Sequence, residues 1–420
     1  MASTAPAVSE SPSRTLDIEA VLEDFPTLHQ KVHGQPLTYL DNAATAQTPK
    51  PVIDAITRFY TEECSNIHRG VHWLSGRATK AYEDARRSVQ KFIGAQDAHE
   101  VVFLRGTTEA VNLVAQTFGR SRVKEGDNVL ITAMEHHSNI VPWQMLCDEV
   151  GAELRIIPID DQGDLILDEL DSLLNARTRL LAISHISNAI GTINPIKDII
   201  ARAHQKDVPV LVDGAQAVPH VPVDVQDLDC DFYAFSGHKL YGPMGVGALY
   251  IKKDILESLP PYQGGGGMIR QVSFEGTTFA SGAERFEAGT PNVVGAIGLG
   301  AAAEYIQAIG FDRIIEHEDS LIEYAQERLA TVKGLRRIGH PKDFVAVYSM
   351  VLDGVHPHDL GTILDRQGVA IRAGHHCAQP LMRHFKVPAT ARASFGIYNT
   401  RQDIDALVDA LNHARELFQL

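Results

Sequence analysis

Polar, reactive side chains follow short apolar runs at several places in the sequence. "VPVLVDGAQ" ends in Asp213 and Gln216, and "DFYAFSGHKLYGPMGVG" continues into Ser236, His238 and Lys239. Three further runs end in the same way, with Thr107 and Thr108 in "RGTTEA", His136 in "MEHHSN" and Asn188 in "SHISNAIG". Ligands of open parallel sheets bind beyond the carboxyl ends of the strands, so we expect these side chains to share one site.

Each of these residues has an ordinary structural interpretation when it is taken alone. Thr107 and Thr108 could be a plain helix N-cap, Asp213 a cap, metal ligand or ion-pair partner, and Lys239 a surface lysine in a turn. Together they favour pyridoxal phosphate. That cofactor needs a lysine for its Schiff base, an aspartate at the pyridinium nitrogen and a helix N-terminus for its phosphate. His136 is the candidate for the ring that lies over the cofactor face.

The stretch "RAGHHCAQP", from Arg372 to Pro380, sets Cys377 behind two histidines. A metal ligand, a nucleophile and an ordinary buried thiol are all compatible with it. A metal site would draw on Cys377 and on the histidine pairs 136–137 and 375–376. Adjacent histidines project in different directions, and neither a second cysteine nor a carboxylate has the spacing of a zinc site, so the sequence predicts no metal.

The elements that must position these residues alternate between strands and helices. From about residue 98 to 250, fully apolar strands alternate with amphipathic helices, which indicates a parallel sheet covered on both faces. After Gly289, long helical patterns run from about 293 to 334 and a smaller α+β pattern follows. We therefore expect an N-terminal tail over 1–15 that is disordered, a large domain over 16–295 and a small domain over 296–420. The first helix is expected to pack on the small domain.

Composition excludes several classes of protein. The 420 residues carry a net charge of −15, which argues against a nucleic-acid-coating surface. The longest apolar stretch, 293–303, is too short to span a membrane, so no membrane partner is expected. The four cysteines, Cys64, Cys147, Cys230 and Cys377, are scattered without a framework spacing. They indicate free thiols in a reducing compartment, and we expect a cytoplasmic location.

At this point the sequence resembles a known family. The stretches "SGHKLYGPMGVGALY", "LVDGAQAVPH", "MEHHSNIVPWQ", "FEAGTPN", "RAGHHCAQPLM" and "ARASFGIYNT" are similar to those of SufS-type (group II) cysteine desulfurases. These enzymes belong to the class V aminotransferase group of fold-type I pyridoxal phosphate enzymes. The resemblance covers about nine-tenths of the chain. It implies an α/β fold with a mostly parallel seven-stranded sheet, and a smaller C-terminal domain that carries the cysteine loop.

The resemblance also implies roles for individual residues. Lys239 would bind the cofactor covalently, Asp213 would contact its pyridinium nitrogen, and Gln216 its ring oxygen. His136 would stack on the ring and assist proton transfers. The phosphate would be held by Thr107, Thr108, Ser236 and His238, with Thr290 reaching in from the other subunit of a homodimer. Asn188 and Arg392 would fix the substrate carboxylate, with Arg372 near the substrate or the cysteine loop. Cys377 would be the nucleophile, and His375, His376 and Arg372 are candidate sources of positive potential that activates its thiol.

The implied reaction converts L-cysteine to L-alanine and leaves the sulfur as a persulfide on Cys377. A SufE-like or SufU-like acceptor would then carry that sulfur toward iron–sulfur cluster assembly. Selenocysteine lyase and cysteine sulfinate desulfinase are alternatives on the same scaffold, and a non-catalytic sulfur carrier is an alternative from another class. One departure is visible, because Gly267 stands where the family often has a glutamate. It affects the expected ordering of a loop near the dimer interface.

Overall fold

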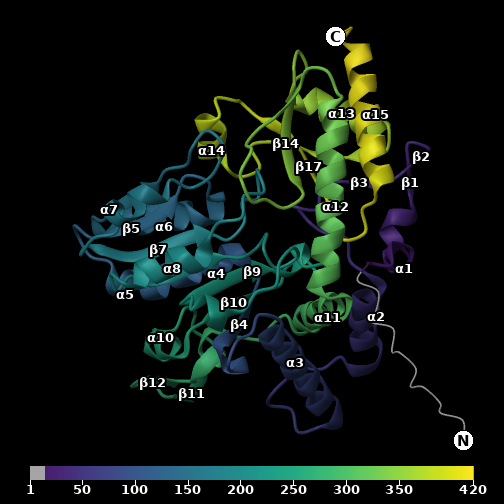
Figure 1. Ribbon diagram of the computed structural model, residues 1–420. Helices are drawn as coiled ribbons and strands as arrows, with labels where there is room; N and C mark the ends of the chain where they lie inside the picture. The colour runs from purple at the N-terminus through teal and green to yellow at the C-terminus, as the bar shows by residue number, and fades with distance from the viewer. Residues whose placement is uncertain (1–14, 420) are drawn as a thin grey trace, which may run out of the picture.

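A seven-stranded sheet forms the centre of the larger part of the molecule (Figure 1). The computed structural model describes residues 15–419, so the tail predicted for 1–15 lies, apart from Thr15, outside the described residues. Only β10 runs antiparallel to its neighbours, which confirms the mostly parallel sheet. In spatial order the strands are β4 (Val101–Leu104), β10 (Gly247–Ile251), β9 (Phe232–Ser236), β8 (Val210–Asp213), β7 (Thr178–Ser184), β5 (Asn128–Thr132) and β6 (Glu153–Ile157).

Both faces of this sheet are covered, which explains why its strands are apolar throughout. Successive side chains of a strand point to opposite faces. In β8, Val210 and Val212 belong to one buried cluster and Leu211 belongs to another. The first cluster packs under α3 (Trp73–Phe92), α8 (Ile196–His204) and α11 (Val293–Ile309), and the second packs under α4 (Thr107–Val114), α6 (Val141–Val150) and α10 (Lys253–Ser258).

A four-stranded antiparallel sheet lies at the other end of the molecule, beside the C-terminal helices (Figure 1). Its spatial order is β13 (Leu335–Arg337), β14 (Val347–Leu352), β17 (Thr390–Ser394) and β16 (Arg372–Gly374). The helices of this part are α13 (Pro357–Arg366), α14 (Gln379–His384) and α15 (Arg401–Leu417). The long helix α12 (Phe311–Ala330) begins beside α11 and runs up along this sheet, so it links the two parts (Figure 1).

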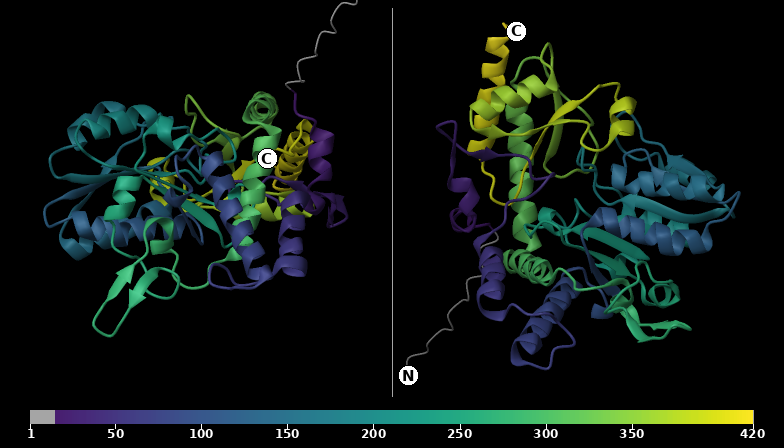
Figure 2. Two further views of the ribbon diagram at one scale, coloured as in Figure 1. Left: turned by 90° about the horizontal axis from the view of Figure 1, so that it is seen from below. Right: turned by 180° about the vertical axis from the view of Figure 1, so that it is seen from behind.

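The N-terminal segment joins both parts. Strand β3 (Thr38–Tyr39) pairs with β15 (Val369–Ala370), and Leu40 belongs to the core of the smaller sheet. Helix α1 (Ile18–Glu23) buries Val21 in the cluster that packs under α3 and α11. The views from below and behind also place the N-terminal segment next to the C-terminal helix (Figure 2). The domain limits at 15 and 295 stay a prediction.

Further elements lie outside the two sheets. The hairpin of β11 (Ile269–Val272) and β12 (Thr277–Phe279) projects from the body of the molecule (Figure 2). Gly267 precedes it with φ of +84°, a conformation that strains any other residue, so the backbone here suits the glycine. Helix α2 (Lys50–Arg58) lies against α11. Among residues 15–419 no single helix is long and apolar enough to cross a bilayer; α11 and α12 reach that length and composition only as a pair bent by 77°.

Candidate active site

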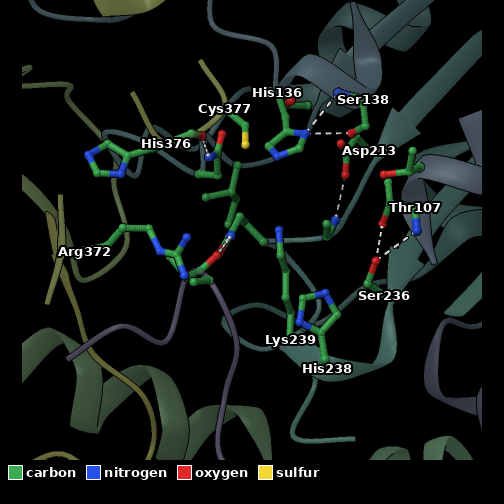
Figure 3. A pocket seen from close by; sticks show the side chains of 18 of the residues that line it. Thr107, His136, Ser138, Asp213, Ser236, His238, Lys239, Arg372, His376 and Cys377 are labelled. Atoms are coloured by element: carbon green, nitrogen blue, oxygen red, sulfur yellow. Dashed lines mark hydrogen bonds between the residues drawn. The ribbon is translucent and has the colours of Figure 1, made fainter. Parts of the chain in front are cut away.

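A cavity of about 250 Å³ lies where the carboxyl ends of the parallel strands face the cysteine loop (Figure 3). The structure brings all but one of the predicted site residues together in its wall. They are Thr107, Thr108, His136, Asn188, Asp213, Gln216, Ser236, His238, Lys239, Arg372, Cys377 and Arg392. Thr290 is the exception, because it is exposed and lines a separate cavity near β4 and α4.

Lys239 and Asp213 are the charged pair at the base of the cavity. Asp213 ends β8, and Lys239 lies on the short turn Gly237–Lys239 that follows the neighbouring strand β9. Burial lowers the pKa of Lys239 to about 8, although Asp213 works in the opposite direction. Burial also raises the pKa of Asp213, against the effect of Lys239 and of the Ala215 N–H that Oδ1 accepts at 3.0 Å. A lysine with this pKa is partly neutral near pH 8 and can act as a nucleophile or a base.

The anion site predicted at "RGTTEA" is built at the start of α4. The hydroxyl of Ser236 accepts the Thr107 N–H at 2.9 Å, and the hydroxyls of Thr107 and Ser236 lie 2.9 Å apart. Gly106 has φ of +148°, and a Cβ added to it would lie 3.0 Å from the Ser236 oxygen. The glycine therefore allows the close approach of two strand ends. Free N–H groups and the positive end of the helix dipole favour a phosphate here.

His136 projects from the end of β5 toward the same cavity (Figure 3). Its Nδ1 accepts the Ser138 N–H at 3.1 Å and lies 2.7 Å from the Ser138 hydroxyl. Burial, followed by the charge of Lys239, lowers the pKa of His136 to about 3. The ring is therefore neutral at physiological pH, with its proton on Nε2. This arrangement suits a ring that stacks on a planar ligand and donates one hydrogen bond.

Arg392 is held at the opposite wall by backbone and carboxylate partners. Its Nη1 donates to the Asn188 carbonyl at 2.7 Å, and its Nη2 donates to Asp41 Oδ1 at 3.2 Å. The same Asp41 accepts from Arg372 Nε at 3.1 Å. The Nε of Arg392 is buried without a hydrogen-bond partner. A buried donor without a partner is costly, so this edge of the guanidinium is suited to a substrate carboxylate.

The cysteine loop reaches the cavity from the smaller sheet. Its backbone is unusual, since His376 and Cys377 both have positive φ, of 52° and 54°. Three hydrogen bonds to residues of the large domain hold the loop. The His137 N–H donates to the Cys377 carbonyl at 2.7 Å, and the Gln379 N–H donates to His137 Nε2 at 3.1 Å. Asn188 Nδ2 donates to the His376 carbonyl at 2.6 Å. The thiol of Cys377 remains exposed. This loop therefore presents a thiol to the space beside Lys239 (Figure 3).

Comparison with known proteins identifies the family. The profile of the aminotransferase class-V family matches residues 38–407. A cysteine desulfurase of Escherichia coli O127:H6 is 53% identical over 404 residues, which cover 96% of this chain and 99% of the relative. One from Enterobacter sp. strain 638 is 54% identical over 401 residues, covering 95% and 98%. The chain belongs to the cysteine desulfurases of the class-V aminotransferase family.

Solved structures of the cysteine desulfurases share the fold. That of CsdA from Escherichia coli, in an S-sulfonic acid form, has a TM-score of 0.89 and 41% identity, with coverage of 96% of this chain and 99% of that one. The apo structure of a cysteine desulfurase from Thermococcus onnurineus NA1 has a TM-score of 0.91 and 38% identity, with the same coverage.

Cysteine desulfurases depend on pyridoxal phosphate, and the cavity of this chain fits that cofactor. The buried amine of Lys239 suits the covalent link, and the buried carboxylate of Asp213 suits a pyridinium nitrogen. The Gly106–Thr107 turn with Ser236 forms a cradle for a phosphate. Among the described residues, no group of three or more His, Cys, Asp or Glu side chains is arranged to hold a metal ion.

The structure corrects one role that the sequence suggested for this desulfurase. His376 was a candidate source of positive potential for Cys377. Burial, and then the charges of Arg392 and Arg372, lower its pKa to about 3, so the ring is neutral. Its Nε2 lies 2.7 Å from the Thr390 hydroxyl. His376 is therefore a support for the loop. Lys239 and Arg392 are the cations that attract a thiolate at Cys377.

Two functional residues of this site were missed from sequence. Asp41 joins Arg372 and Arg392, and His137 holds the Cys377 backbone. A sequence signal for Asp41 existed, because this residue directly follows the mainly apolar run "LTYL", just as other site residues follow apolar runs. No local signal separates the role of His137 from that of its neighbour His136.

Proposed function

We propose that this protein is a SUF-type (group II) cysteine desulfurase that converts L-cysteine to L-alanine and accepts the sulfur on Cys377. The observation that carries the proposal is the pairing, in one cavity, of the buried amine of Lys239 with the exposed thiol of Cys377. A transaminase would need the lysine and not the thiol. A sulfur carrier would need the thiol and not the lysine.

The chain's own residues divide the work of this reaction. Pyridoxal phosphate, when bound, draws electrons from the substrate and so weakens its Cα–H and Cβ–S bonds. Arg392 binds the substrate carboxylate through its free Nε edge, and Asp41 with the Asn188 carbonyl keeps the guanidinium oriented. Burial lowers the pKa of Lys239 to about 8 and so favours its neutral amine. The neutral amine can take the proton from the substrate Cα and return one to the product.

Sulfur transfer is the task of the cysteine loop. The Cys377 thiolate would attack the substrate sulfur, so that an S–S bond forms while the substrate Cβ–S bond breaks and its electron pair stays with the carbon. Protonation of that carbon would give alanine, so L-cysteine and the thiol become L-alanine and a persulfide with no external oxidant. Because the Cys377 side chain is exposed, the persulfide lies within reach of a small acceptor protein, of the SufE-like or SufU-like kind.

A pair of variants tests the assignment. Cys377→Ala should keep the cofactor absorbance and lose persulfide formation, which intact mass spectrometry reads as one added sulfur. Lys239→Ala should lose the absorbance of the covalently linked cofactor. Alanine production by Cys377→Ala at the wild-type rate, with or without acceptor, would overturn the proposal. Turnover with selenocysteine and cysteine sulfinate, measured beside L-cysteine, separates the alternative activities on the same scaffold.

A homodimer is part of the proposal. Thr290 does not line the cavity of its own chain, so it can contribute to a phosphate site only in a partner. Large apolar side chains are exposed in the same part of the molecule, including Val71, Trp73 and Phe274, the last at the tip of the β11–β12 hairpin. Sedimentation should give a mass of two chains, and a monomer that retains full activity would argue against the shared site. The free thiols, two of them buried, support a reducing cytoplasm.

A further inference from the structure

A second cavity, of about 310 Å³, lies between the C-terminal half of α12 and the outer strands of the smaller sheet. It shares no residue with the wall of the active site. Leu329 of α12, Leu335 of β13, and Tyr348 and Met350 of β14 give it a mainly apolar wall. Its volume is at the lower end of the range of small-molecule sites.

Arg337 is the only charged residue in the wall of this cavity. Its guanidinium carbon lies 4.0 Å from the ring centre of Phe344 and 4.7 Å from that of Tyr348. These two rings hold the planar group in place. Its Nε and Nη2 are buried and have no hydrogen-bond partner, and no carboxylate of the described residues lies within ion-pair distance. The guanidinium is therefore held in place with two buried N–H donors that no other described side chain satisfies.

Arg337 is half-buried, and the two fully buried arginines of the described chain provide a comparison. Arg86 is paired with Glu287 at 2.7 Å, and Arg392 is paired with Asp41 at 3.2 Å. Arg392 keeps one free edge, at the place where we expect a substrate carboxylate. Arg337 has two free buried nitrogens and no acidic partner among residues 15–419. Because a buried charge without a partner is costly, an incoming anion gains more here than at the surface.

The surroundings define the class of anion. Besides Arg337, the polar side chains of the wall are Gln326, His340 and the phenol of Tyr348. Burial, followed by the charge of Arg337, lowers the pKa of His340, so it is a neutral donor or acceptor at pH 7. A single cation in an apolar wall suits one negative charge on an apolar body, whereas a polyphosphate would need several cations.

We propose that this cavity is a binding site for a small apolar monocarboxylate, with Arg337 as the residue that binds the carboxylate. The site is independent of the cysteine desulfurase reaction. One contact brings it near that reaction: Ser349, between Tyr348 and Met350 in β14, points to the opposite side of the strand, where its hydroxyl donates to the Ala189 carbonyl and accepts from Thr390. Strand β14 thus lines the cavity with one face and supports the cysteine loop, through Thr390 and His376, with the other.

Isothermal titration of the holoenzyme with 4-methylpentanoate tests the site, with 4-methylpentanamide as the uncharged probe of the same shape. The carboxylate should bind at least about tenfold more tightly than the amide, as expected for a charge-assisted pair. Arg337→Met should remove this binding. Arg336→Met is the matched control, because Arg336 is exposed in the same strand and is absent from the wall, and it should bind as wild type.

A second variant covers the case in which Arg337→Met does not fold. Leu329→Phe keeps Arg337 and fills the cavity, and it should also lose the binding of 4-methylpentanoate. Binding of 4-methylpentanoate at Arg392 instead would persist in both variants. Binding that persists in Arg337→Met or in Leu329→Phe therefore overturns the proposal. Equal binding of the amide and the carboxylate overturns it as well.

Discussion

His376→Gln offers the sharpest test of how the cysteine loop works. The wild-type ring is buried and neutral, with a pKa lowered from 6.5 to about 3, so the folded state cannot take up the proton that the unfolded chain binds below pH 6.5. Stability therefore falls as the pH drops below 6.5, and it continues to fall until the pH reaches about 3. Between pH 7 and pH 5 this residue alone costs about 2 kcal/mol of the free energy of unfolding.

Glutamine takes up no proton in this pH range in either the folded or the unfolded state, so the two proteins should respond differently to acid. At pH 7, His376→Gln should be less stable by about 1 kcal/mol, because the contact with Thr390 is weakened. At pH 5, wild type has lost about 2 kcal/mol more than the variant, so the order should reverse. Urea unfolding of the cofactor-bound proteins at the two pH values measures the difference. The other histidines with a lowered pKa, among them His136, His185 and His238, are present in both proteins, so their contributions cancel.

The same variant separates a supporting role from an electrostatic one. A cation ~6 Å from a thiolate contributes about 3 kcal/mol at an effective dielectric constant of ~20, which is roughly 100-fold in thiolate population. A neutral His376 contributes none of this, so the rate of Cys377 alkylation by iodoacetamide at pH 7 should change by less than about threefold. A drop of more than tenfold, together with an unchanged stability gap between pH 7 and pH 5, would refute the neutral ring.

Two further substitutions address the remaining walls of the active site. Gly106→Ala places a Cβ 3.0 Å from the Ser236 oxygen, at a φ of +148° that strains alanine. The variant should be less stable by about 1–3 kcal/mol and should lose more of its cofactor on gel filtration. Unchanged retention of the cofactor would contradict the phosphate cradle. Asp41→Asn removes the carboxylate that Arg372 and Arg392 share. It should raise the KM for L-cysteine severalfold and change the cofactor absorbance little. A change confined to kcat would contradict the assigned site for the substrate carboxylate.

Much of the active site was predictable because its residues obey local rules. Asp213 and Lys239 each follow an apolar strand, and in a parallel sheet such strand ends meet at one edge. The residue types of the Gly106–Thr107–Thr108 turn are enough to predict the start of a helix. The role of Cys377, by contrast, came from its resemblance to a family, since three interpretations of "RAGHHCAQP" were open from the residues themselves.

What only the tertiary structure decided depends on contacts between distant segments. Asp41 is paired with Arg372 and Arg392, more than three hundred residues away in sequence, because the N-terminal segment lies against the smaller sheet. His376 is neutral because burial in the surrounding core, and then two arginines, lower its pKa. Arg337 has no carboxylate partner among the described residues, because none of their acidic side chains folds back onto it. Sequence determines which side chains stand at the ends of strands. Charge state depends on burial and on neighbours, and the folded chain alone supplies both.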